Sequence, residues 1–120
     1  MQHSSARGPP VFEIRDAAGA TNLLVETAAL GRALAERLGQ ANIVLMRGHG
    51  ATMAGQSIKH AVFRAIYAAL NASMQMDAMR LGEVTYLADE EAMKGMEIND
   101  RFVDRSWSLW KQEAMGEHPS

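Results

Sequence analysis

The stretch Asn42-Ile43-Val44-Leu45-Met46-Arg47-Gly48-His49-Gly50-Ala51-Thr52-Met53 decides the expected fold of this chain. It begins with an uninterrupted apolar run, Ile43–Met46, whose length and composition are typical of a strand buried on both faces. The glycines on either side of His49 predict a sharp turn that presents an imidazole at the end of this strand. A second short apolar run, 51–54, predicts an adjacent antiparallel strand. Because imidazole is both a common metal ligand and a base that titrates near neutrality, His49 is the first candidate for chemistry.

The segments before this hairpin predict one strand and one helix. Alternation over 11–15 predicts a half-exposed strand with Phe12 and Ile14 on one face, and 16–20 is expected to form a turn. A helix then follows that Thr21 or Asn22 can cap and that Gly39 ends. Its apolar positions fall on one stripe, formed by Leu23, Leu30, Leu34 and Leu38.

The segments after the hairpin predict two further helices. Ser57 is expected to cap a long helix, Ile58–Leu81, whose broad apolar stripe indicates cover on more than one face and packing against the hairpin. Gly82 closes it. Residues 83–87 are expected to be a short extended segment, counted as a short strand. A last helix should start at Asp89 and carry an apolar stripe with an aromatic end, formed by Met96, Val103, Trp107, Trp110 and Ala114.

This order of strands and helices predicts an α/β layered fold with a partly antiparallel sheet. We expect a flexible arm over residues 1–8, the folded part over 9–115 and a frayed tail over 116–120. A central strand needs neighbours on both edges, and the chain offers few strands to supply them. We therefore expect a partner chain or a further segment to complete the sheet.

Composition excludes several classes of protein. The chain has 120 residues, 48% hydrophobic and 22% charged, which indicates a folded globular domain. Its net charge of −2, with acids and bases interleaved, argues against a nucleic-acid groove or a polybasic membrane surface. It has no cysteine, so disulfides and thiolate metal sites are excluded. No apolar run approaches the roughly 20 residues of a membrane span, and a cytoplasmic location is expected.

The run Val44–Gly55, followed by Ser57 and the helix through 61–65, resembles the class II aldolase/adducin family. The resemblance continues upstream through 10–16 and 21–25, and downstream through 81–87. These flanks are most similar to the branch that contains fuculose-phosphate aldolase and pyridine-dicarboxylate decarboxylases. The resemblance covers the C-terminal half of the family domain. It therefore implies that this chain represents part of a layered α/β/α enzyme.

The resemblance implies a metal-dependent carbon–carbon lyase, either an aldolase or a decarboxylase, that acts on a small hydroxylated or carboxylated substrate. Family members bind a divalent metal, zinc as the first expectation and manganese as the second, through three histidines. By resemblance His49 is the third of these ligands. The other two form a His-x-His pair in the N-terminal half, beside a catalytic acidic residue. This sequence has no such pair, since His3, His60 and His118 are isolated, and no catalytic residue is expected within it.

Two further residues are candidates for substrate binding. Arg47 could hold a substrate carboxylate with two parallel hydrogen bonds, although a structural ion pair explains an arginine there equally well. Tyr86 could approach a neighbouring active site, because family sites lie between the subunits of a homo-oligomer, commonly a tetramer. An ordinary packed tyrosine is the alternative. The rival interpretation of the whole chain is a non-catalytic module, as in adducin, which keeps the fold in a structural role.

Overall fold

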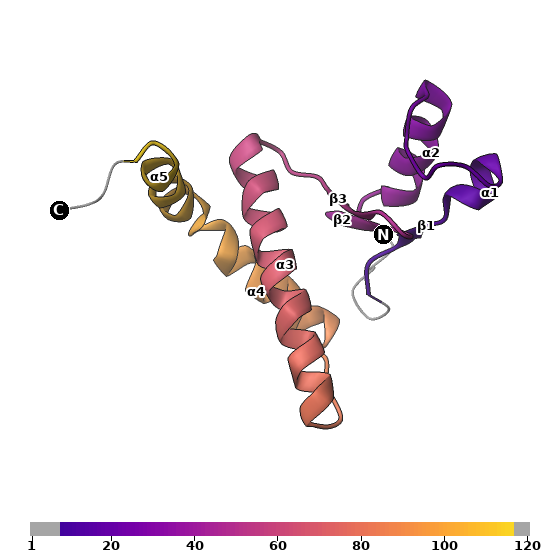
Figure 1. Cartoon of the computed structure of the whole chain (residues 1–120). Helices are drawn as coiled ribbons and strands as arrows, with labels where there is room; N and C mark the ends of the chain where they lie inside the picture. The colour runs from indigo at the N-terminus through magenta and orange to yellow at the C-terminus, as the bar shows by residue number, and fades with distance from the viewer. Residues whose placement is uncertain (1–7, 117–120) are drawn as a thin grey trace. The chain divides into compact units, whose positions relative to one another are not determined.

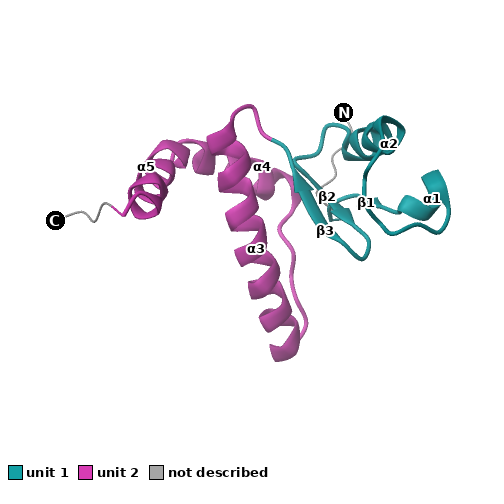
Figure 2. Ribbon diagram, turned by 45° about the horizontal axis from the view of Figure 1, so that its top comes forward, with its two compact units in different colours: residues 1–54 teal, residues 55–120 magenta. Residues whose placement is uncertain are grey.

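The structure is a computed structural model that describes residues 8–116 (Figure 1). Residues 1–7 of the predicted arm and 117–120 of the predicted tail lie outside the described residues. The chain divides into two compact units, Met1–Ala54 and Gly55–Ser120, which we call unit 1 and unit 2 (Figure 2). No helix among the described residues is long and apolar enough to cross a membrane.

Unit 1 is built around a three-stranded sheet in the order β1-β2-β3. Strand β2, Ile43–Met46, is central: β1, Val11–Phe12, pairs parallel to it, and β3, Gly50–Met53, pairs antiparallel to it. Met46 lies opposite Gly50, so three residues, 47–49, make the turn between β2 and β3. The predicted hairpin is therefore confirmed. The central strand also has a neighbour on each edge, although β1 contributes only 2 residues.

Two helices connect β1 to β2. Helix α1, Ile14–Ala18, replaces the predicted end of the first strand and the predicted turn, because the Glu13 side chain accepts from the Arg15 N–H and caps a helix there. Helix α2, Ala28–Leu38, contacts both β1 and β2. It ends at Gly39 as predicted, but its N-cap is Thr27. Thr21 and Asn22 do not cap it, since their side-chain oxygens accept from the N–H groups of Leu23 and Leu24 instead.

The core of unit 1 lies on the α2 side of the sheet. Phe12, Ile14 and Val44 are buried, and α2 packs its apolar stripe against them through Leu30, Leu34 and Leu38. Val44 is fully enclosed, whereas the next residue, Leu45, is 38% exposed. The prediction that β2 is buried on both faces is therefore wrong. Successive side chains of a strand point to opposite faces, and only one face is covered within unit 1.

Unit 2 is helical. Helix α3, Ile58–Leu81, has the predicted bounds, with Ser57 as its N-cap and Gly82 as its C-cap. Its first half contacts α5, Val103–Ala114, through Phe63, whose ring centroid lies 4.6 Å from that of Tyr67 and 6.1 Å from that of Trp110. The second half of α3, residues 69–81, is exposed on all sides. The predicted cover on more than one face is therefore wrong for this half, and the packing of α3 against the hairpin stays a prediction.

Two other expectations for unit 2 are wrong. Residues 83–87 do not form a strand. The predicted last helix is two helices, α4, Asp89–Asp100, and α5, because the N–H groups of Arg101 and Phe102 bond to carbonyls three residues back and the helix tightens and ends. In sum, the described residues combine helices with a small mixed sheet, in agreement with an α/β fold. A second helical layer on the sheet stays a prediction.

Candidate functional site

His49 lies at the tip of the β2–β3 hairpin. Its backbone N–H donates to the carbonyl oxygen of Met46, 3.0 Å away, and so closes the turn. Gly48 and Gly50 on either side have φ values of 71° and 147°, which residues with a Cβ rarely adopt. The His49 residue is exposed. The sequence prediction of a histidine at the turn that ends the strand agrees with this placement.

Arg47 is fixed on two sides at the start of the same turn. Its backbone N–H donates to the carbonyl oxygen of Phe12, 3.2 Å away, which extends the pairing of β1 with β2. Its side-chain Nε donates to Oε2 of Glu13 and forms an ion pair. The structural ion pair that the sequence left open is therefore present. Glu13 was not among the predicted site residues, since it is separated from Arg47 by 34 positions and no local signal connects the two.

The Glu13–Arg47 pair shifts the titration of both groups. The hydrogen bond from Arg47 lowers the pKa of the Glu13 carboxyl, and the bond from the Arg15 N–H adds to this effect. The same hydrogen bond raises the pKa of the Arg47 guanidinium. Both groups are therefore charged at neutral pH. Nη2 of Arg47 is buried and has no hydrogen-bond partner among the described residues, so one donor of the guanidinium is unsatisfied.

Tyr86 belongs to unit 2 and lies in the segment between α3 and α4. It is 64% exposed, and its hydroxyl oxygen accepts from Nε2 of Gln75, 3.2 Å away. It is therefore not a packed core tyrosine. Its position relative to Arg47 and His49, which lie in unit 1, stays a prediction.

A protein metal site needs several donor side chains that converge on one point. Among residues 8–116, no three histidine or carboxylate side chains converge closely enough to hold one. His49 is thus available as a single ligand, and the described residues by themselves do not make a metal site. A divalent metal at His49 would need further donors from elsewhere.

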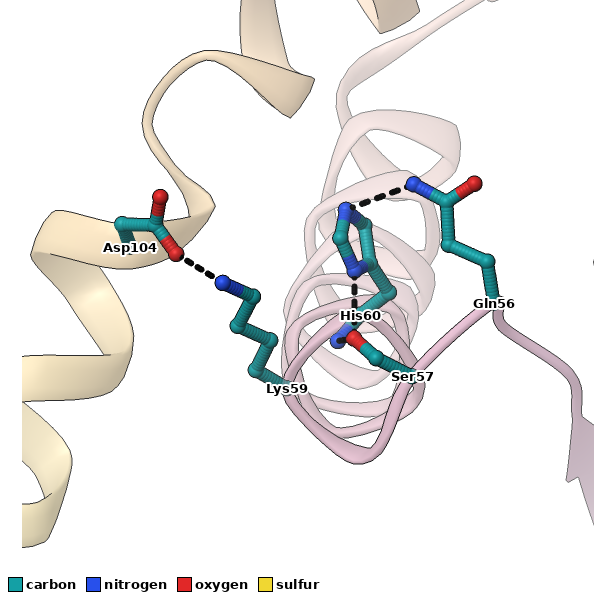
Figure 3. Close-up of polar contacts among 5 residues, drawn as sticks. All are labelled: Gln56, Ser57, Lys59, His60 and Asp104. Carbon is teal, nitrogen blue, oxygen red and sulfur yellow. Dashed lines mark hydrogen bonds and ion pairs between the residues drawn. The ribbon is translucent and has the colours of Figure 1, made fainter.

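His60, which the sequence analysis treats as an isolated histidine, is engaged in the start of α3 (Figure 3). Its Nδ1 lies 2.6 Å from Oγ of Ser57, and its Nε2 lies 3.1 Å from Nε2 of Gln56. On α5, Asp104 forms an ion pair with Lys59, which lowers the pKa of the Asp104 carboxyl. The Lys59–Asp104 ion pair joins the N-terminus of α3 to α5, and the bonds of His60 to Ser57 and Gln56 explain it as a structural residue of the same helix start.

Comparisons with known proteins identify the family of this chain. A sequence model described as the class II aldolase and adducin N-terminal domain matches residues 7–76, which include β1, the hairpin and most of α3. Among curated proteins, decarboxylase tropJ of Talaromyces stipitatus is 39% identical over 83 residues, which cover 60% of this chain and 31% of the relative. The chain thus spans about a third of the length of that decarboxylase. The chain belongs to the class II aldolase/adducin family.

Proposed function

We propose that this chain supplies part of a divalent-metal-dependent carbon–carbon lyase, a decarboxylase or an aldolase acting on a small hydroxylated or carboxylated substrate. The observation that carries the proposal is the exposed imidazole of His49, held between Gly48 and Gly50 on a closed turn. Membership of the family and the likeness to a decarboxylase support the lyase class. The expected metal is zinc, with manganese as the alternative.

In this proposal His49 is one metal ligand, and the remaining ligands come from residues beyond those described. Zinc sites in enzymes use several protein ligands and keep one position open for substrate or water. One imidazole does not meet that need, and the chain spans only 31% of the decarboxylase it matches. We therefore expect tight metal binding only in a longer protein or an assembly that brings further donors to His49.

Arg47 binds the substrate carboxylate in this proposal. Glu13 accepts from Nε of the guanidinium and Nη2 is buried, so an anionic group would reach Arg47 at its remaining nitrogen, Nη1. A guanidinium fixed in this way can donate to a carboxylate with defined geometry. Because Arg47 and His49 are separated by one residue of the same turn, a carboxylate at Arg47 would lie close to the metal ligand. Tyr86 is a second candidate for substrate contact. It would reach the active site of a neighbouring subunit in a homo-oligomer, commonly a tetramer in this family.

The alternative is a non-catalytic, adducin-like structural module. The exposed second half of α3 favours it, because Leu70, Met74 and Leu81 present apolar surface of the kind that binds another protein. In that case His49 would be only a turn residue.

Metal content after dialysis separates the two functions. We suggest four proteins: the 120-residue chain and a version extended by the family sequence that precedes the matched region, each with and without His49→Ala. Only the extended protein with His49 should retain stoichiometric zinc, and only it should have lyase activity. His49→Ala should still fold, since an exposed turn residue contributes little packing.

Three outcomes would contradict the proposal. Stoichiometric metal on the short chain would show that the described residues suffice. Retained metal in the extended His49→Ala protein would remove His49 from the ligand set. An extended protein that folds and assembles but binds no metal would support the structural module instead.

A further inference from the structure

The loop that precedes α2 has an unusual backbone. Leu23 has a φ of 70°, and no other residue except glycine has a positive φ among residues 8–116. A leucine in this left-handed conformation is strained, since its Cβ crowds the following carbonyl. The loop is held by its own side chains. Oγ1 of Thr21 accepts from the Leu23 N–H, and Oδ1 of Asn22 accepts from the Leu24 N–H, each at 3.0 Å.

The strained conformation places the Leu23 side chain against the turn that carries His49. A methyl group added at Gly48 would lie 3.2 Å from Cδ1 of Leu23, so the side chain lies directly over the Gly48 backbone. The same side chain packs against the buried cluster of Phe12, Ile14 and Val44. Leu23 therefore connects the rigid core of unit 1 to the middle residue of the turn.

The turn is thus held at two successive residues. Glu13 fixes the side chain of Arg47, and Leu23 covers the backbone of Gly48, directly before His49. A glycine turn without such support would be free to change its direction, because glycine has access to both signs of φ. A strained residue persists only where the surrounding structure over-determines it, and such residues concentrate at functional sites.

We propose that Leu23 is a positioning residue of the 47–49 turn: its side chain, placed by a left-handed backbone, holds Gly48 so that Arg47 and His49 keep fixed directions. The significance for metal binding rests on the proposed function, whereas the positioning itself is a property of this chain. Positioning matters because a metal ligand is oriented by neighbouring residues that do not bind the metal themselves. Removing such a neighbour commonly weakens the affinity for the metal by roughly 10–100-fold.

The first test is the backbone order of the turn, measured by ¹⁵N relaxation on the 120-residue chain. Leu23→Asn replaces the Cδ methyl groups by a polar amide of similar size and so loses the apolar contact with the turn, while asparagine tolerates a positive φ, so the loop should keep its path. We expect the order parameters of Gly48 and His49 to fall from roughly 0.85 to below about 0.6, with those of Val44 and Leu45 unchanged. Leu24→Ala is the matched control, because Leu24 is 45% exposed and should leave all four values unchanged.

The comparison between turn and strand separates positioning from ordinary packing. A residue that merely packs in the core would loosen Val44 and Leu45 together with the turn. Should Leu23→Asn fail to fold, Leu23→Ala gives the same measurement, because it removes the Cδ methyl groups without adding a polar group. Unchanged order at Gly48 and His49 in either folded variant would overturn the inference.

The second test uses zinc alone as the probe, in the extended protein described above. Leu23→Asn should weaken zinc binding by roughly 10–100-fold, and Leu24→Ala should not change it. If the extended protein with Leu23 binds no zinc, the proposed function fails while the relaxation experiment still decides the positioning role. If it binds zinc and Leu23→Asn binds equally tightly, the inference is wrong and the proposed function stands.

Discussion

Glu13 performs two tasks at the residue scale. Oε1 accepts from the Arg15 N–H at 3.0 Å and caps α1, while Oε2 accepts from Nε of Arg47. One carboxylate therefore connects the start of α1 to the turn that carries His49. The ion pair keeps Arg47 from turning into solvent, and this makes Glu13 a positioning residue for the proposed carboxylate contact.

Replacing Glu13 by glutamine should change how the stability of unit 1 depends on pH. The folded-state pKa of Glu13 is lowered from its ordinary value of 4.5, so its ionised form stabilises the fold. This contribution is fully present above pH 4.5 and is lost as the pH falls through the lowered folded-state pKa. Glu13→Gln should therefore reduce the free energy of unfolding at pH 7 and have little effect in strong acid.

The measurement is urea denaturation at several pH values between neutrality and strong acid. Glu36→Gln is the control, since Glu36 is an exposed carboxylate of α2 and forms no part of the Glu13–Arg47 ion pair. A Glu13→Gln profile that runs parallel to the unchanged one would show that the ion pair contributes nothing in solution.

At the scale of elements, α3 depends on a close approach at its N-terminus. A Cβ at Gly55 would lie 2.7 Å from the backbone nitrogen of Ala61 and 3.0 Å from His60. Both neighbours belong to the first turn of the helix, which Ser57 caps and which Lys59 connects to α5. Backbone cannot yield as a flexible side chain does, so the turn before α3 requires a glycine.

Gly55→Ala should therefore destabilise unit 2 by about 1–3 kcal/mol, the usual cost of forcing extra volume into a filled space. Gly95→Ala is the matched control. It lies inside α4 with open space around a Cβ, and alanine there should stabilise the helix by up to about 1 kcal/mol. Thermal unfolding followed by circular dichroism measures both. Equal melting temperatures for the two variants would rule out the close approach at Gly55.

At the scale of the whole molecule, apolar surface is concentrated on the second half of α3. Leu70 is 52% exposed, Met74 66% and Leu81 91%. Their spacing of four and seven residues places them on one stripe of the helix. Monomeric proteins rarely expose so much apolar surface in one stripe, so we expect another protein surface to cover it.

We therefore predict that the chain self-associates through this stripe. The average mass measured by light scattering should rise with concentration, and the double substitution Leu70→Lys with Met74→Lys should bring it back toward a single chain. The double substitution Asn71→Lys with Ala72→Lys is the control, because it adds the same charge at exposed positions of the same helix outside the stripe. A constant monomer mass at high protein concentration would contradict the prediction.

Much of this protein follows from local sequence signals. The bounds of α3, its cap at Ser57 and its end at Gly82 follow from short-range hydrogen bonds and backbone preferences. The β2–β3 hairpin with His49 at its tip follows from an apolar run and two glycines, which favour strand and turn wherever they occur. For these elements the information lies within a few residues of each position.

Only the tertiary structure decided how distant residues meet. Glu13 reaches Arg47, Leu23 covers Gly48, and β1 pairs in parallel with β2, all across many intervening positions. Local preference cannot predict such contacts, because the energy that selects them comes from burying Phe12, Ile14 and Val44 together. The sequence by itself thus determined which residue is presented at the turn, and the fold determined what holds it there.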